Sequence, residues 1–115
     1  MIALTIPEPT PSVNVFHGRH WSRKLRERQK WGWLVRAARL QAHVLPSHPD
    51  FVRMRIERFG ARILDRDNFI AGAKWLIDAL VAEGFASDDS PEHLIVEYTQ
   101  KVGKPHRTII EVSTP

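Results

Sequence analysis

Carboxylates occur in two groups within one stretch of the chain. Asp65 and Asp67 lie one residue apart and are followed by Asn68, and a second pair, Asp88 and Asp89, lies further along. Mg²⁺ takes oxygen ligands and keeps several of its waters, so two or three carboxylates from different segments are enough to hold it. The pattern therefore indicates a magnesium site formed by Asp65, Asp67 and Asp89, with Asp88 beside it.

Ordinary structural roles also account for these residues. Asp67 and Asn68 suit the N-cap of a helix, and acidic side chains near a helix start are stabilised by the helix dipole. The sequence Ser-Asp-Asp-Ser-Pro at 87–91 is typical of a turn. Spacing alone leaves both interpretations open.

Four motifs follow one another in the same region. They are D-R-D-N at 65–68, K-x-x-x-D-A-L at 74–80, A-E-G-F at 82–85 and D-D at 88–89. Together they resemble the core of the RusA family of Holliday junction resolvases, which are phage- and prophage-associated endonucleases. P-S-V-N at 11–14 resembles the N-terminal P-S-x-N element of that family. The element order is similar over nearly the whole chain, but the resemblance is specific only across about residues 65–89.

The resemblance implies a set of site residues and partners. In the family, aspartates bind magnesium and a lysine on the following helix assists. Carried over by motif, the Mg²⁺ ligands would be Asp65, Asp67 and Asp89, the lysine would be Lys74, and the supporting residues would be Asn68, Asp88 and Asn14. The resemblance further implies a homodimer that acts on branched DNA, the four-way junction.

Lys74 departs from the family pattern. In the best-known members the lysine follows D-x-D-N by about one helical turn, whereas Lys74 lies about two turns after Asp67. Its spacing to D-A-L is kept, and two turns return it to the face of Asp67. Lys74 and Asp78 also have the i, i+4 spacing of a surface ion pair, which is an ordinary structural role for both.

Positive charge is concentrated elsewhere in the chain. The net charge is +4, and residues 17–44 contain eight Arg and Lys side chains against one acid, Glu27. Several cations fall in the first turns of an expected helix, where the helix dipole disfavours them, so phosphate is the partner that their position indicates. The predicted DNA contacts are Arg19, Arg23, Lys24, Arg26, Arg28 and Lys30. A solvated basic helix is the alternative. Trp21 or Trp33 could stack on a displaced base, although tryptophan at helical spacing is typical of a core.

The elements that position these residues follow from hydrophobic periodicity. We expect strands at 2–6, at Phe51 to about Arg58, at 94–102 and at 107–112, the last two joined as a hairpin by G-K-P-H. We expect helices from Trp21 to about Leu45 and from about Phe69 to Leu80, with Gly84 in the C′ position after the second. The sequence therefore predicts an α+β fold: a single two-layer domain over residues 1–115, in β-α-β-α-β-β order, with two helices packed on one face of a small mixed sheet.

Composition limits the class of protein. At 115 residues and 43% hydrophobic content the chain can form one core. It contains no cysteine, which excludes disulfides and thiolate metal sites. No apolar run is long enough to span a membrane and no signal peptide is evident, so we expect a cytoplasmic protein without membrane contact.

The favoured hypothesis is a Mg²⁺-dependent endodeoxyribonuclease that resolves four-way junctions in DNA recombination and repair. One alternative is a non-catalytic nucleic-acid-binding module in which the acids are only caps and turns. Another is a nuclease of the same fold that acts on flaps or forks.

Overall fold

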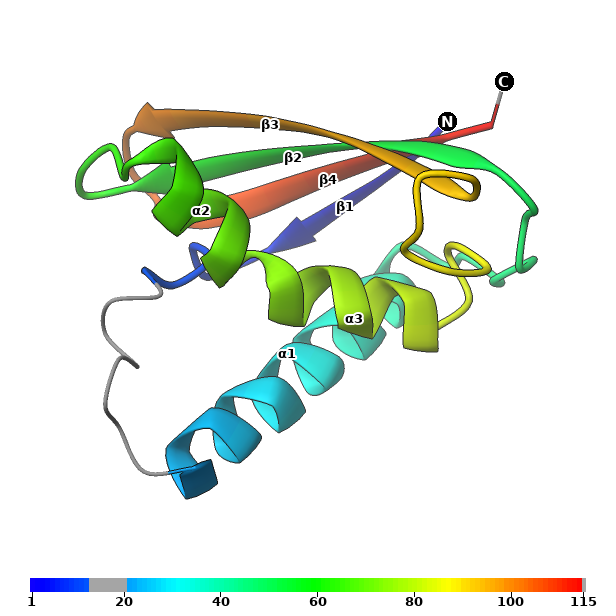
Figure 1. The fold of residues 1–115 in the computed structure, drawn as a ribbon, viewed down its shortest axis with the longest axis horizontal. Helices are drawn as coiled ribbons and strands as arrows, with labels where there is room; N and C mark the ends of the chain where they lie inside the picture. Colours follow the sequence, from blue (N-terminus) through cyan, green and yellow to red (C-terminus); the bar gives the residue numbers. More distant parts are fainter. Residues whose placement is uncertain (13–20, 115) are drawn as a thin grey trace.

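The computed structural model describes residues 1–12 and 21–114, and the expected order of elements is confirmed. The expected sites Asn14 and Arg19 lie outside the described residues. The strands are β1 (Ile2–Ile6), β2 (Val52–Gly60), β3 (Leu94–Val102) and β4 (Arg107–Ser113), and the helices are α1 (Trp21–Gln41), α2 (Arg66–Gly72) and α3 (Lys74–Ala82). The chain forms a two-layer α+β domain in which all three helices lie on one face of a mixed sheet (Figure 1).

The predicted hairpin between the last two strands is wrong. The sheet order is β1-β4-β2-β3, so β2 separates β3 from β4. β2 pairs in parallel with β3 and antiparallel with β4, and β4 pairs antiparallel with β1. Residues 103–106 carry the chain across the end of β2, a distance of about 10 Å that four residues can span. The Gly103 amide donates to the Gly60 carbonyl there.

Burial explains why β2 takes the position between them. Its inward side chains Val52, Met54 and Ile56 are all buried, whereas on β3 only Leu94 is buried and the other residues are half-buried or exposed. A strand with a strongly apolar face gains from neighbours on both edges, and a more polar strand is tolerated at the edge. Short loops favour neighbouring strands as partners, and here burial outweighs loop length.

The core lies between the inner face of the sheet and helices α1 and α3. Trp31 and Val35 of α1 are fully buried, as are Leu76 and Leu80 of α3, and they belong to one apolar cluster with β2. In the described part of the chain, none of the helices is long and apolar enough to cross a membrane.

The second predicted helix is divided into two at Ala73. Ala73 ends α2 and begins α3 with φ −80° and ψ −5°, and its amide donates to the Phe69 carbonyl while its carbonyl accepts from the Ile77 amide. The chain is therefore bent rather than interrupted at this point. Lys74 becomes the first residue of α3.

Both long helical segments end with the same motif. The expected C′ glycine, Gly84, has φ +93°, and the Phe85 amide donates to the Leu80 carbonyl, as in a Schellman motif. Helix α1 ends at Gln41, before the predicted Leu45, because His43 adopts φ +56° and closes a similar motif.

Candidate functional site

Asp65 and Asp67 lie at the start of α2. Asp65 is the N-cap residue, with extended ψ of 145° and no side-chain capping bond, and Asp67 is in the first helical turn. Both side chains are exposed, and neither carboxylate forms a hydrogen bond or an ion pair with the described residues. Two carboxylates are thus available at one helix start. The dipole of α2 favours negative charge there, which is a structural reason for the same residues.

The strand β3 fixes the chain just before this pair. The Gln100 side-chain amide donates to the Leu64 carbonyl at 2.8 Å and accepts from the Leu64 amide at 2.9 Å. These two hydrogen bonds fix the backbone at Leu64, and thereby the direction in which the chain enters α2 at Asp65. Gln100 was not predicted from the sequence. The available signal was a polar residue at an inward position of a strand, on the same face as Leu94 and Val96.

Asn68, an expected supporting residue, joins α2 to the segment before the undescribed residues. Its side-chain Nδ2 donates to the Ser12 hydroxyl at 2.7 Å. That segment is held against the sheet in turn, because the Thr108 hydroxyl donates to the Glu8 carbonyl at 2.8 Å. The P-S-x-N element and the D-R-D-N element are therefore in contact, as members of one site would be.

Arg58 of β2 also holds the segment that contains Thr10 and Ser12. Its guanidinium is buried, and it donates to the Thr10 carbonyl at 2.8 Å and to the Arg62 carbonyl at 3.1 Å. Gly60 makes this position possible, because a Cβ at Gly60 would lie 2.2 Å from the Arg58 Nη1 atom.

Lys74 contacts two carboxylates at the start of α3. Its ammonium lies 2.8 Å from Asp78, at i, i+4, and it also forms an ion pair with Asp89. The hydrogen bonds that Lys74 donates to Asp78 and to Asp89 raise the pKa of Lys74, and the bond from Lys74 lowers the pKa of Asp89. The contact with Asp78 agrees with the structural role of Lys74, and the contact with Asp89, one of the expected ligands, agrees with the functional role. Asp88 is exposed beside Asp89.

The donor chemistry suits Mg²⁺, because the expected ligands are exposed carboxylates and the chain contains no thiol. Their arrangement is less complete. Among the described residues, no group of three or more His, Cys, Asp or Glu side chains is placed to hold a metal ion. The structure brings Asp89 to Lys74, and it leaves Asp65 and Asp67 at the other end of α2.

Tyr98 of β3 is a further polar residue beside this region that the sequence analysis missed. Its ring packs edge-to-face on Phe69 of α2, with centroids 5.5 Å apart. Partial burial raises the pKa of Tyr98, and the positive charges of Lys74 and Arg66 act in the opposite direction. Tyr98 and Gln100 are two residues apart on one strand face, so both project towards α2.

The predicted DNA contacts on α1 differ from one another. Arg23, Lys24, Arg26 and Arg28 are exposed, and none forms an ion pair with a described residue. Lys30 instead pairs with Glu8 and Glu27, at 2.5 Å and 3.0 Å. Burial lowers the pKa of Lys30, but the hydrogen bonds to these acids outweigh it and the net shift is upward. Lys30 therefore joins α1 to the segment after β1.

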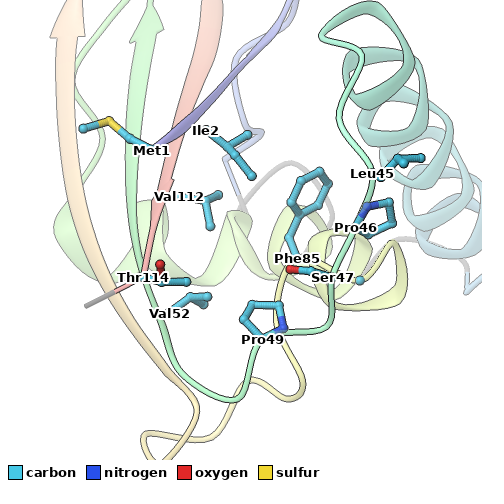
Figure 2. Close-up of a pocket in the computed structure, with 11 residues that line it drawn as sticks. Met1, Ile2, Leu45, Pro46, Ser47, Pro49, Val52, Phe85, Val112 and Thr114 are labelled. Carbon is cyan, nitrogen blue, oxygen red and sulfur yellow. The ribbon is translucent and has the colours of Figure 1, made fainter.

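A small apolar pocket of about 90 Å³ lies at the far end of the sheet. Figure 2 shows Phe85 between Pro46 and the strand residues Ile2 and Val112. Among the described residues that line it, no side chain is ionisable. This pocket offers packing for the loop after α1 and no group for acid, base or metal chemistry.

No family model matches the chain. A search of curated proteins also found no match.

Proposed function

We propose that this protein is a Mg²⁺-dependent endonuclease of branched DNA, similar to the RusA resolvases. The observation that carries the proposal is the pair of exposed carboxylates, Asp65 and Asp67, which have no ion-pair partner among the described residues and lie at the end of the domain where Asn68 meets Ser12. A solvated pair of acids without a counter-ion is well suited to bind a divalent cation. Arg23, Lys24, Arg26 and Arg28 of α1, which form no ion pair within the described part of the chain, supply the opposite requirement, contacts for phosphates.

Asp65, Asp67 and Asp89 would hold the ion. Mg²⁺, when bound, supplies Lewis acidity towards a phosphodiester and lowers the pKa of a coordinated water. The chain itself contributes orientation and charge. Gln100 and Asn68 fix the start of α2, and the Lys74 ammonium would neutralise negative charge that develops on the scissile phosphate.

Two identical sites are needed to cut opposed strands of a four-way junction. A C2 homodimer would place one site on each strand pair, which is why we include a homodimer in the proposal. A role in DNA recombination and repair, in the cytoplasm, belongs to the same proposal.

The strongest competing candidate is a non-catalytic nucleic-acid-binding module. Two observations favour it: Lys74 already contacts Asp78 and Asp89, and the described residues form no ready group of metal ligands. Such a module would bind DNA through α1 equally well with its aspartates replaced.

The test is cleavage of an end-labelled synthetic four-way junction by the purified chain, in Mg²⁺ and in EDTA. We expect nicks in opposed strands only in Mg²⁺, and none in a linear duplex of the same arms. Binding without cleavage in Mg²⁺ or Mn²⁺ would favour the binding module. Faster cleavage of flaps or forks than of junctions would identify a nuclease with a different substrate.

A further inference from the structure

A shallow hollow is lined by residues of α1 and α3, and none of them is one of the expected Mg²⁺ ligands. Its volume is about 300 Å³, and its floor is formed by Gly32 of α1 with Ala79 and Ala82 of α3. No atom lies within 4 Å of the position that a Cβ would take on Gly32, so the backbone there is open to a ligand. The helices run side by side beneath it (Figure 1).

Trp33 forms one wall of this hollow, and it is not part of the core. Its side chain is 69% exposed, whereas Trp31, two residues earlier, is fully buried. The Arg36 guanidinium carbon lies 5.8 Å from the Trp33 ring centroid, within the range of a cation–π contact. An exposed indole beside an arginine presents a flat surface with positive charge at its edge.

The acid that lines the hollow, Glu83, is shared by two cations, Arg36 in the lining and Arg39 beside it. The Glu83 carboxylate accepts from Arg39 at 2.8 Å and from Arg36 at 3.4 Å, so two guanidinium groups share one negative charge. This arrangement also fixes Arg36 beside the indole ring.

The charge extends along α1 from the same face. Arg26 is seven residues before Trp33, two helical turns away, and it forms no ion pair with a described residue. Arg26, Gln29, Trp33 and Arg36 follow the i, i+3 and i, i+4 spacing of one helix face, and all four are exposed. We call these four residues the α1 stripe.

The chemistry of the stripe favours one kind of occupant. A planar aromatic ring with an attached phosphate matches a flat indole, an open glycine and the nearby Arg26, which has no ion-pair partner among the described residues. A protein partner that buried the stripe would have to bring an acid for Arg26, whereas a nucleotide carries both the flat ring and the negative charge. Charge complementarity therefore points to nucleic acid with an unstacked base.

We propose that Trp33 and Arg36 form a stacking site for an unpaired nucleobase of DNA, with the adjoining phosphate on Arg26. The inference rests on the DNA-binding half of the proposed function and is independent of cleavage.

The test measures binding in EDTA, where no cleavage can occur. Fluorescein-labelled oligothymidylate and a duplex of the same length are titrated by anisotropy at one salt concentration. We expect Trp33→Ala to weaken oligothymidylate binding by about tenfold, as for loss of one stacked base, with duplex affinity changed less than about twofold. Trp33→Phe keeps an aromatic face and should retain most of the affinity. Leu40→Ala is the matched control, because Leu40 is an exposed apolar residue on α1 beyond the hollow.

Each outcome decides between explanations. Equal losses in single-stranded and duplex binding, or no loss in Trp33→Ala, would overturn the stacking site while leaving DNA binding intact. A wild-type chain that binds neither DNA would overturn the stacking site and the DNA-binding half of the proposed function together. A change from dimer to monomer mass in Trp33→Ala by light scattering, with binding of oligothymidylate unaltered, would assign the hollow to contact between copies of the chain.

Discussion

The start of α1 and the start of α2 both carry clustered charge, but in opposite relation to the helix dipole. Asp65 and Asp67 lie at the positive end of α2, where negative charge is stabilised even without a ligand. Arg23 and Lys24 lie in the first turn of α1, where positive charge is disfavoured, and no acid of that turn compensates them. The helix dipole therefore explains the acids of α2 without a ligand and does not explain the cations of α1, and substitution tests both groups.

The largest expected effect is on the acidic side of this comparison. Asp65→Asn, Asp67→Asn and Asp89→Asn should each lower the rate of Mg²⁺-dependent junction cleavage by roughly two orders of magnitude or more, because each removes a ligand charge. Junction affinity in EDTA should stay the same, since the phosphate contacts are elsewhere. The rate is measured in single turnover with labelled junction.

Glu92→Gln is the matched control for these variants, since Glu92 is an exposed acid in the loop that carries Asp89. Its cleavage rate should equal that of the wild type. If a variant with Asp65→Asn, Asp67→Asn and Asp89→Asn together still nicked junctions at the full rate, the helix dipole alone would explain the acids of α2.

A smaller effect is expected on the basic side. The pairs Arg23→Ala with Lys24→Ala, and Arg26→Ala with Arg28→Ala, should each flatten the dependence of log affinity on log salt by about two, one unit for each lost phosphate contact. The measurement is anisotropy of labelled junction over a series of salt concentrations in EDTA.

Arg53→Ala with Lys104→Ala removes the same charge from exposed positions on β2 and on the loop after β3. This control pair should leave the salt slope unchanged. Equal flattening by the control pair would mean that net charge, and not the start of α1, governs binding.

The smallest effect concerns the stability of the Lys74 cluster. Lys74→Met and Asp78→Asn should each lower the free energy of unfolding by only about 0.3–0.5 kcal/mol, the usual contribution of an exposed i, i+4 pair. Lys74→Met should nevertheless slow cleavage at saturating junction while Asp78→Asn does not, if the ammonium acts on the scissile phosphate. Equal and minor effects of both variants, with cleavage intact, would leave Lys74 only a structural role.

The pH dependence of this stability follows from the two pKa shifts. The lowered pKa of Asp89 gives a contribution that is present above its ordinary value of 3.8 and is lost as pH falls through the lowered value. The raised pKa of Lys74 gives a contribution present below its ordinary value of 10.5 and lost as pH rises through the raised one. The difference in melting temperature between wild type and Lys74→Met should thus be flat near neutral pH and shrink in acid.

Periodicity predicted the fold layers because each element has a clear apolar face. Val52, Met54 and Ile56 alternate, and Trp31, Val35 and Ala38 follow helical spacing, so the buried faces could be assigned from the sequence. Strand order could not, since it depends on which strand has the more apolar face to share with two neighbours. The division at Ala73 was also missed, because the apolar positions before and after it continue the same helical spacing.

The candidate site was predicted as residue types, and only in part as contacts. The i, i+4 pair of Lys74 and Asp78 was predicted and is confirmed. The pairing of Lys74 with Asp89 brings together residues separated by a helix and a turn, so spacing alone could not reveal it. Gln100 and Tyr98 were missed because a polar residue at an inward strand position indicates a specific contact only once the facing helix is known.

The Arg58 side chain has a consequence for how this sequence can vary between relatives. Its guanidinium occupies the space that a side chain at position 60 would need, while its hydrogen bonds to the Thr10 and Arg62 carbonyls keep it there. A larger residue at Gly60 would require the Arg58 guanidinium to move away or to be replaced, and the Thr10 and Arg62 carbonyls would then lose its hydrogen bonds. In an alignment of homologous chains, positions 58 and 60 should therefore change together. Where Arg58 is replaced, the carbonyl at position 10 should have another hydrogen-bond donor.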